Sequence, residues 1–163
     1  MPKLKQCGQT VFMLCVIFCT MIVLCVQSCR QDSQYSKPVT LNAILDAIQH
    51  VETGGEPDPA NARGAHNELG WMQITRPYYI DAAATLKHVG IAPPPYEIAA
   101  TDWWWSRQLV IAYWSRHCPE AMTGPNPKVL AKHHNGGPSG KAVATYWPKV
   151  RNRLQIAGFY TEE

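Results

Sequence analysis

One feature constrains the fold of this chain more than any other. It is a predicted helix that ends in a glutamate and a pair of glycines. Apolar residues recur at helical spacing over residues 41–51, which predicts an amphipathic helix with one buried face. Gly54 and Gly55 then end the helix, because glycine tolerates the left-handed backbone of a helix end. Glu52 lies beside the buried face at the C-terminal edge, where the helix dipole and apolar neighbours both disfavour a negative charge. This setting favours the protonated carboxyl that a general acid requires, and the alternative is a solvated glutamate at a helix end.

The rest of the chain predicts a mainly α domain over residues 40–160, with about five helices and one small β-hairpin. Prolines and glycines keep residues 54–68 in a loop, and the short apolar stretch 70–74 predicts one strand of the hairpin. Capping residues and prolines mark the starts of the later helices. These helices are expected at 75–90, at 101–117, from 126 onward and at 146–156, with a turn at 133–138.

The helix predicted at 101–117 is apolar on almost every side, which indicates a buried central helix. It contains Trp103, Trp104, Trp105 and Trp114. Aromatic faces could form a platform on which sugars stack, but the helical spacing favours core packing for most of these tryptophans.

The N-terminus differs in kind from the domain. Lys3 and Lys5 precede an apolar run over residues 11–26, and no other charge occurs before Arg30. This pattern predicts a signal peptide or membrane anchor over residues 1–28, followed by a polar tether over 29–39. The residues before Cys29 resemble the lipid-attachment signal of bacterial lipoproteins. A lipoprotein modified at Cys29, an uncleaved anchor and simple secretion stay open, and each places the domain outside the cytoplasm, facing the periplasm or the cell exterior.

Cysteine usage and charge exclude several classes of protein. Cys118 is the one cysteine after residue 29, so the domain cannot hold a disulfide framework. Removing residues 1–28 takes away two of the 15 basic residues and none of the 12 acidic ones, which leaves a net charge near +1 and no nucleic-acid footprint. The adjacent His133 and His134 suggest zinc, but no third ligand follows at a recognisable spacing. We expect a monomer without cofactor or metal.

Three motifs follow one another at wide spacing. They are VETGG at 51–55, GWMQI with PYYID at 70–81, and HNGGPSG with YW at 134–147. In this order they resemble the invertebrate-type lysozymes and their bacterial relatives, and more distantly the soluble lytic transglycosylases. The resemblance covers residues 41–152 and implies a lysozyme-like α+β fold and a peptidoglycan-cleaving glycosidase.

The resemblance also implies roles for individual residues. Glu52 falls on the family's catalytic glutamate, which protonates the glycosidic oxygen between N-acetylmuramic acid and N-acetylglucosamine. The other matching positions are expected to bind the glycan; they are Gln73, Tyr79, His134, Asn135, Gly136 and Trp147.

One departure from the family's pattern concerns a second carboxylate. The family places an aspartate six or seven residues before the glycine of its G-x-x-Q-I motif, where this chain has Arg63 and Gly64. Glu68 is the first substitute that we consider, and Asp58 is the second. Without a second carboxylate, an acetamido or hydroxyl group of the substrate can attack the anomeric carbon instead, which is the lytic transglycosylase route.

Two other classes of function stay open. If the missing aspartate means lost chemistry, the domain would be a peptidoglycan-binding module. Some relatives are also credited with isopeptidase activity, which needs an activated nucleophile, and Ser139 is the candidate because it follows His134 closely.

Overall fold

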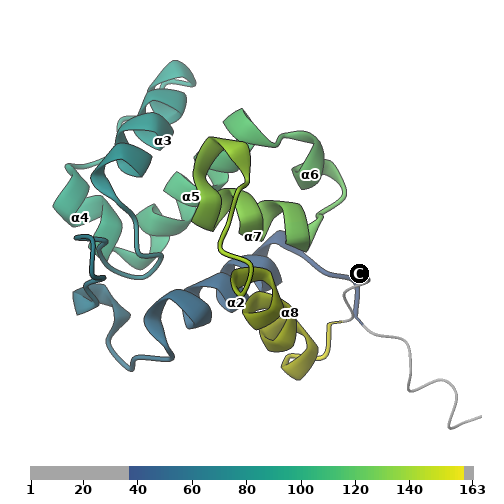
Figure 1. The fold of residues 1–163 in the computed structure, drawn as a ribbon. Coiled ribbons are helices and arrows are strands. Elements are labelled where there is room, and N and C mark those ends of the chain that lie inside the picture. The colour runs from purple at the N-terminus through teal and green to yellow at the C-terminus, as the bar shows by residue number, and fades with distance from the viewer. Residues whose placement is uncertain (1–36, 160–163) are drawn as a thin grey trace, which may run out of the picture. The chain divides into compact units, whose positions relative to one another are not determined.

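The computed structural model describes residues 37–159, which belong to one compact unit. The predicted export segment, Cys29 and most of the predicted tether lie outside the described residues. Within residues 37–159 there are seven α-helices, two short 3-10 helices and no regular strand (Figure 1). No helix in this part of the chain has the length and apolar character that crossing a membrane requires. The prediction of a mainly helical, lysozyme-like fold is confirmed.

Helix α2 (Leu41–Thr53) forms as its sequence predicts. The Thr40 hydroxyl accepts a hydrogen bond from the Ala43 backbone N–H at 3.2 Å and so caps the helix. Gly54, with φ of 61°, ends it in the left-handed conformation. Its apolar face is fully buried at Ile44 and Ile48, so Glu52 is fixed at the end of a firmly packed helix.

The strand predicted at 70–74 is wrong, because this stretch is a tight turn. Leu69 and Ile74 form a single antiparallel bridge, with hydrogen bonds of 3.1 and 3.0 Å between their backbones. Gly70 and Gln73, with φ of 70° and 46°, both adopt left-handed backbone, which cannot continue an extended strand. Gly70 packs so closely on the Ala100 carbonyl oxygen that a Cβ would lie 2.0 Å from it.

The next three helices are α3 (Arg76–His88), α4 (Tyr96–Thr101) and α5 (Trp103–His117). Helix α3 begins where predicted, with Thr75 as its cap. Helix α4 was not predicted, and it corrects the expected start of α5. Thr101 ends α4, where its hydroxyl donates to the Glu97 carbonyl at 2.7 Å. Asp102 is the cap of α5, because its carboxylate accepts from the Trp105 backbone N–H at 2.8 Å.

The C-terminal part contains α6 (Glu120–Thr123), α7 (Pro127–Gly136) and α8 (Tyr146–Ile156). Helix α6 was not predicted, whereas the starts of α7 and α8 were. The turn expected at 133–138 is partly wrong, because α7 continues to Gly136 before the 3-10 turn η3 (Gly137–Ser139). His134 and Asn135 therefore lie on the last turn of a helix.

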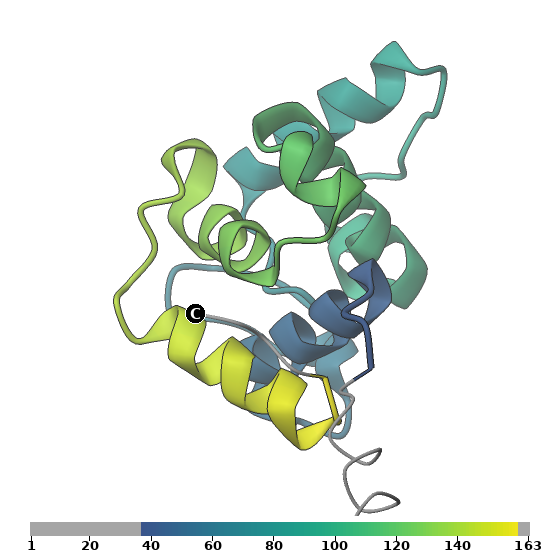
Figure 2. The same cartoon turned by 90° about the vertical axis from the view of Figure 1, so that its right-hand side faces the viewer.

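The helices pack around one core. Helix α2 lies beside α8 and also contacts α7, while α3 packs on α5 (Figures 1 and 2). Trp114 is fully buried at the centre, as the helical spacing predicted. Trp103 and Trp104 correct that prediction, since they are 48% and 50% exposed. The Arg107 guanidinium lies 4.9 Å from the Trp103 ring centre, which partly covers that ring.

Candidate active site

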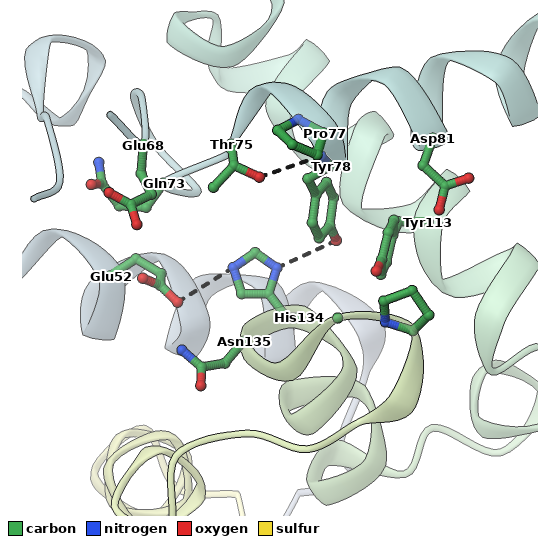
Figure 3. A pocket seen from close by; sticks show the side chains of 12 residues that line it. Glu52, Glu68, Gln73, Thr75, Pro77, Tyr78, Asp81, Tyr113, His134 and Asn135 are labelled. Atoms are coloured by element: carbon green, nitrogen blue, oxygen red, sulfur yellow. Dashed lines mark hydrogen bonds and ion pairs between the residues drawn. The ribbon is translucent and has the colours of Figure 1, made fainter. Parts of the chain in front are cut away.

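A cleft of about 400 Å³ collects residues that are far apart in the sequence (Figure 3). One wall comes from the end of α2 and the end of α7, and the other comes from the turn at 68–75 and the start of α3. The lining residues are Glu52, Glu68, Gln73, Thr75, Pro77, Tyr78, Asp81, Tyr113, His134, Asn135, Gly137 and Pro138. Among the residues predicted from sequence, this set brings together Glu52, Glu68, Gln73, His134 and Asn135.

Tyr146 and His134 both contact the same oxygen of the Glu52 carboxyl. The Tyr146 hydroxyl donates to Oε1 at 2.5 Å, and His134 Nε2 lies 3.4 Å from the same atom. The Glu52 side chain is 17% exposed, so water reaches only part of it. Among residues 37–159 these polar contacts both use Oε1, which leaves Oε2 for a bound molecule.

Tyr146 is a permanent donor to this carboxyl. Burial raises its pKa well above the ordinary value of 10, and the negative charge of Glu52 and the hydrogen bond to it add to the shift. Because the phenol keeps its proton over the working range of pH, the hydroxyl always has a proton to donate to Glu52.

His134 is held from its other side by Tyr78. The Tyr78 hydroxyl lies 3.4 Å from His134 Nδ1, and the Tyr78 ring stacks on Tyr113 with centres 3.9 Å apart. Burial raises the pKa of Tyr78 well above 10, and Tyr113 adds to the shift. Burial also raises the pKa of Tyr113 to about 12. His134 Nε2 faces the Glu52 carboxyl, and in the tautomer that carries its proton on Nε2, the Nδ1 atom accepts a hydrogen bond from the Tyr78 hydroxyl.

Glu68 and Gln73 face Glu52 from the opposite wall (Figure 3). The backbone N–H of His66 donates to Glu68 Oε2 at 2.8 Å, and Gln73 Nε2 donates to the Gly70 carbonyl at 2.8 Å. Gly64 gives both side chains their space. A Cβ at position 64 would lie 2.2 Å from Glu68 Oε2 and 2.8 Å from Gln73 Oε1.

Asp81 lines the cleft beyond Tyr78 and Tyr113. Its carboxylate contacts His117 Nε2 at 2.5 Å and Arg116 Nη1 at 2.6 Å. With both oxygens engaged, Asp81 carries a compensated charge and braces α3 against α5.

No protein-family model matches the chain. Three curated proteins are similar to it: lysozyme 1 of Crassostrea virginica, lysozyme of Ostrea edulis and invertebrate-type lysozyme 3 of Caenorhabditis elegans. The identities are 26%, 31% and 29%, over 78%, 55% and 66% of this chain. The chain is a relative of the invertebrate-type lysozymes.

The aligned parts cover 67% and 63% of the two oyster proteins and 82% of the nematode protein. The crystal structure of Tapes japonica lysozyme matches with a TM-score of 0.56 at 22% identity, covering 78% of this chain and all of that one. The shared fold and the relatives together indicate a lysozyme-type glycoside hydrolase.

Other positions that the lysozyme resemblance suggested do not line the cleft in the described part of the chain. The Tyr79 hydroxyl donates to the Pro94 carbonyl at 2.7 Å. Trp147 is 7% exposed and packs in the core. Gly136 lies against the backbone of residues 141–142, where a Cβ would clash. Asp58, the second substitute carboxylate, is exposed and bonded to Asn61.

Tyr78 and Tyr146 were not among the site residues expected from the sequence. Both tyrosines occur inside the quoted motifs, but the residue predicted to bind the glycan was the neighbour in each case. The neighbours are Tyr79 in PYYID and Trp147 in YW. Helical phase separates the two neighbouring residues in each case, because consecutive helix residues point about 100° apart. The Ser139 hydroxyl, suggested as an isopeptidase nucleophile, is exposed and lies 3.4 Å from the Gly136 carbonyl. Within residues 37–159 no three potential metal ligands come together.

Proposed function

We propose that this protein cleaves the β-1,4 bond between N-acetylmuramic acid and N-acetylglucosamine in peptidoglycan, with Glu52 as general acid. The observation that carries the proposal is the asymmetric setting of the Glu52 carboxyl. Tyr146 and His134 both approach Oε1, so the acidic proton belongs on Oε2, which is left for the substrate. Oε2 gives that proton to the glycosidic oxygen as the bond breaks.

The Tyr146 hydrogen bond and the His134 contact also favour the transition state. As Glu52 loses its proton, negative charge develops on the carboxyl, and hydrogen bonds to a charged acceptor are stronger than those to a neutral one. Donors fixed in advance at that position stabilise the charge without rearrangement. Tyr146 and His134 are therefore positioning residues in this proposal, and Glu52 is the catalytic residue.

Glu68 is the second carboxylate that we propose. It lines the same cleft as Glu52, and its carboxylate fills the space that a side chain at position 64 would enter. Position 64 is one of the two where the lysozyme resemblance leads us to expect an aspartate. Glu68 would stabilise the oxocarbenium-like sugar, attack it, or activate water, according to its distance from Glu52.

The alternative is a lytic transglycosylase, and the glycine at position 64 favours keeping it open. In that reaction the 6-hydroxyl group of the muramic acid residue attacks its own anomeric carbon, and Glu52 protonates the leaving oxygen. The products then carry anhydro ends instead of reducing ends. A peptidoglycan-binding module that cleaves nothing is the remaining outcome.

Mass analysis of fragments from purified peptidoglycan separates these possibilities. Glu52→Gln keeps the shape of the side chain but removes the acidic proton, so turnover should fall by roughly 10²- to 10⁴-fold. Glu56→Gln, at an exposed glutamate in the following loop, is the matched control and should cleave normally. A Glu52→Gln protein that keeps more than a tenth of the wild-type rate would contradict the assignment.

Export and anchoring extend the proposal, because peptidoglycan lies outside the cytoplasm. We propose that residues 1–28 direct export and that Cys29 or the preceding apolar run holds a monomeric domain at the membrane. Fractionation of cells checks this, and a protein recovered entirely in the soluble fraction would contradict the anchor.

A further inference from the structure

A second cavity, of about 490 Å³, adjoins the cleft and takes no part in the chemistry proposed above. Its lining residues are Arg63, His66, Asn67, Leu69, Thr75, Arg76, Pro77, Tyr96, Glu97 and Thr101. Thr75 and Pro77 line both cavities. The two cavities are therefore adjacent, with Thr75 and Pro77 between them.

The second cavity carries more positive than negative charge. Two arginines, Arg63 and Arg76, face a single acidic lining residue, Glu97, and His66 contacts the Glu68 carboxylate of the adjoining cleft. Glu97 is paired with Arg76, which leaves Arg63 without a carboxylate partner among residues 37–159. The cavity is therefore suited to a ligand that brings carboxylates of its own.

The floor of the cavity is fixed before any ligand binds. The Tyr96 side chain is buried, and its hydroxyl lies 2.7 Å from the Ile74 carbonyl and 3.2 Å from the Asn67 carbonyl. The Arg76 guanidinium lies over the Tyr96 ring, 4.7 Å from its centre. Asn67 is held in left-handed backbone, with φ of 64°. Asparagine adopts this backbone more often than most other non-glycine residues do.

We infer that the second cavity binds the peptide that peptidoglycan carries on its muramic acid, through that peptide's carboxylates. The inference rests on the proposed function, because only a muramic acid in the cleft brings such a peptide to this place. The peptide would enter past Thr75 and Pro77 and place a carboxylate on Arg63. It follows that the protein distinguishes peptide-bearing strands from bare glycan.

The test uses the full chain with Glu52→Gln, so that no cleavage occurs. The probe is a synthetic stem tripeptide in which glutamate and diaminopimelate keep free carboxylates, and the comparison is the same peptide with those groups amidated. Titration followed by NMR or calorimetry should detect the free acid and should show at least tenfold weaker binding of the amide.

Two charge-removing variants locate the site. Arg63→Gln should weaken binding of the free acid about tenfold. Lys149→Gln removes one positive charge from an exposed position of α8 and should leave the affinity unchanged. Equal binding of acid and amide, or equal effects of the two substitutions, would overturn the inference. Displacement by inorganic phosphate at the same concentrations would also overturn it, because the site would then be a general anion site.

The enzymatic counterpart compares intact peptidoglycan strands with strands whose peptides have been removed by an amidase. The wild-type kcat/KM should be several-fold higher on peptide-bearing strands, and Arg63→Gln should reduce that ratio by raising KM. Failure of the two proposals is distinguishable. Peptide binding without cleavage of any glycan refutes the glycosidase alone, whereas cleavage without peptide binding refutes this inference alone.

Discussion

Replacing Tyr146 by phenylalanine tests whether the donors on Glu52 contribute to catalysis or only to folding. The hydroxyl lies 2.5 Å from Glu52 Oε1, and burial first, then the nearby Glu52 carboxylate, raises its pKa well above 10. A neutral hydrogen bond contributes about 0.5–1.5 kcal/mol, whereas one to a charged group contributes about 1.5–3 kcal/mol. Since Glu52 becomes charged as it gives up its proton, the transition state should lose about 1 kcal/mol more than the ground state. That difference lowers kcat roughly fivefold to tenfold.

The assay pairs turnover on glycan strands with thermal unfolding. Tyr79→Phe is the matched control, because its hydroxyl also donates one hydrogen bond, at 2.7 Å, but to the Pro94 carbonyl outside the cleft. Both substitutions should lower stability by about 1 kcal/mol or more, and only Tyr146→Phe should lower kcat. A Tyr146→Phe protein with kcat within twofold of wild type would refute the electrostatic role. In a Glu52→Gln background, Tyr146→Phe should cause no further loss of turnover.

Two further predictions concern the fold. Cys118 is fully buried, and this burial, together with the nearby Glu120, raises the pKa of its thiol to about 11. At pH 8 the thiol should therefore resist labelling in the native protein and react only on unfolding. Peptide mapping of the labelled protein checks this. Gly70→Ala should destabilise the domain by more than the roughly 1–2 kcal/mol of left-handed backbone alone, because a Cβ would lie 2.0 Å from the Ala100 carbonyl oxygen. Gly90→Ala, at φ of 81° with nothing within 4 Å, isolates the backbone cost, and equal losses in thermal unfolding would contradict the packing argument.

Local signals predicted the helices well where the cap and the buried face lie in the same short segment. Thr40 and Thr75 are caps because their hydroxyls meet backbone N–H groups three residues on. The same reasoning was wrong at 133–138, where turn-forming residues are dense but α7 continues to Gly136. Buried contacts of Leu130 and His134 with the core hold that last turn in place, and such long-range packing overrides local propensity.

The candidate site was predictable to the extent that its residues stand in recognisable motifs. Glu52, Gln73 and His134 were each predicted separately, and the fold brings them to one cleft. The contact between Tyr146 and Glu52 joins residues 94 positions apart, and no periodicity in the sequence encodes such a pairing. Trp103 is half-exposed although its helix is apolar on almost every side. The sequence of that helix does not reveal which side the neighbouring helices leave uncovered.

A two-residue exchange tests whether Glu68 serves as the second carboxylate. A Cβ at position 64 would lie 2.2 Å from Glu68 Oε2 and 2.9 Å from its Cδ, so a side chain at 64 and the Glu68 carboxylate compete for one space. The backbone at Gly64 is not left-handed, so an aspartate is permitted there once Glu68 is shortened. The one other close atom, Gln73 Oε1 at 2.8 Å, ends a side chain that can shift.

Glu68→Gly should therefore lower turnover nearly as far as Glu52→Gln does, by roughly 10²-fold or more. Adding Gly64→Asp to Glu68→Gly should restore part of the loss, because it returns a carboxylate to the same space from a different backbone position. Gly64→Asp alone should displace the Glu68 carboxylate and so lower turnover. Thermal unfolding of all three variants separates loss of fold from loss of chemistry. If Glu68→Gly keeps wild-type turnover and the products carry anhydro ends, the substrate supplies its own nucleophile, and the carboxylate opposite Glu52 only shapes the cleft.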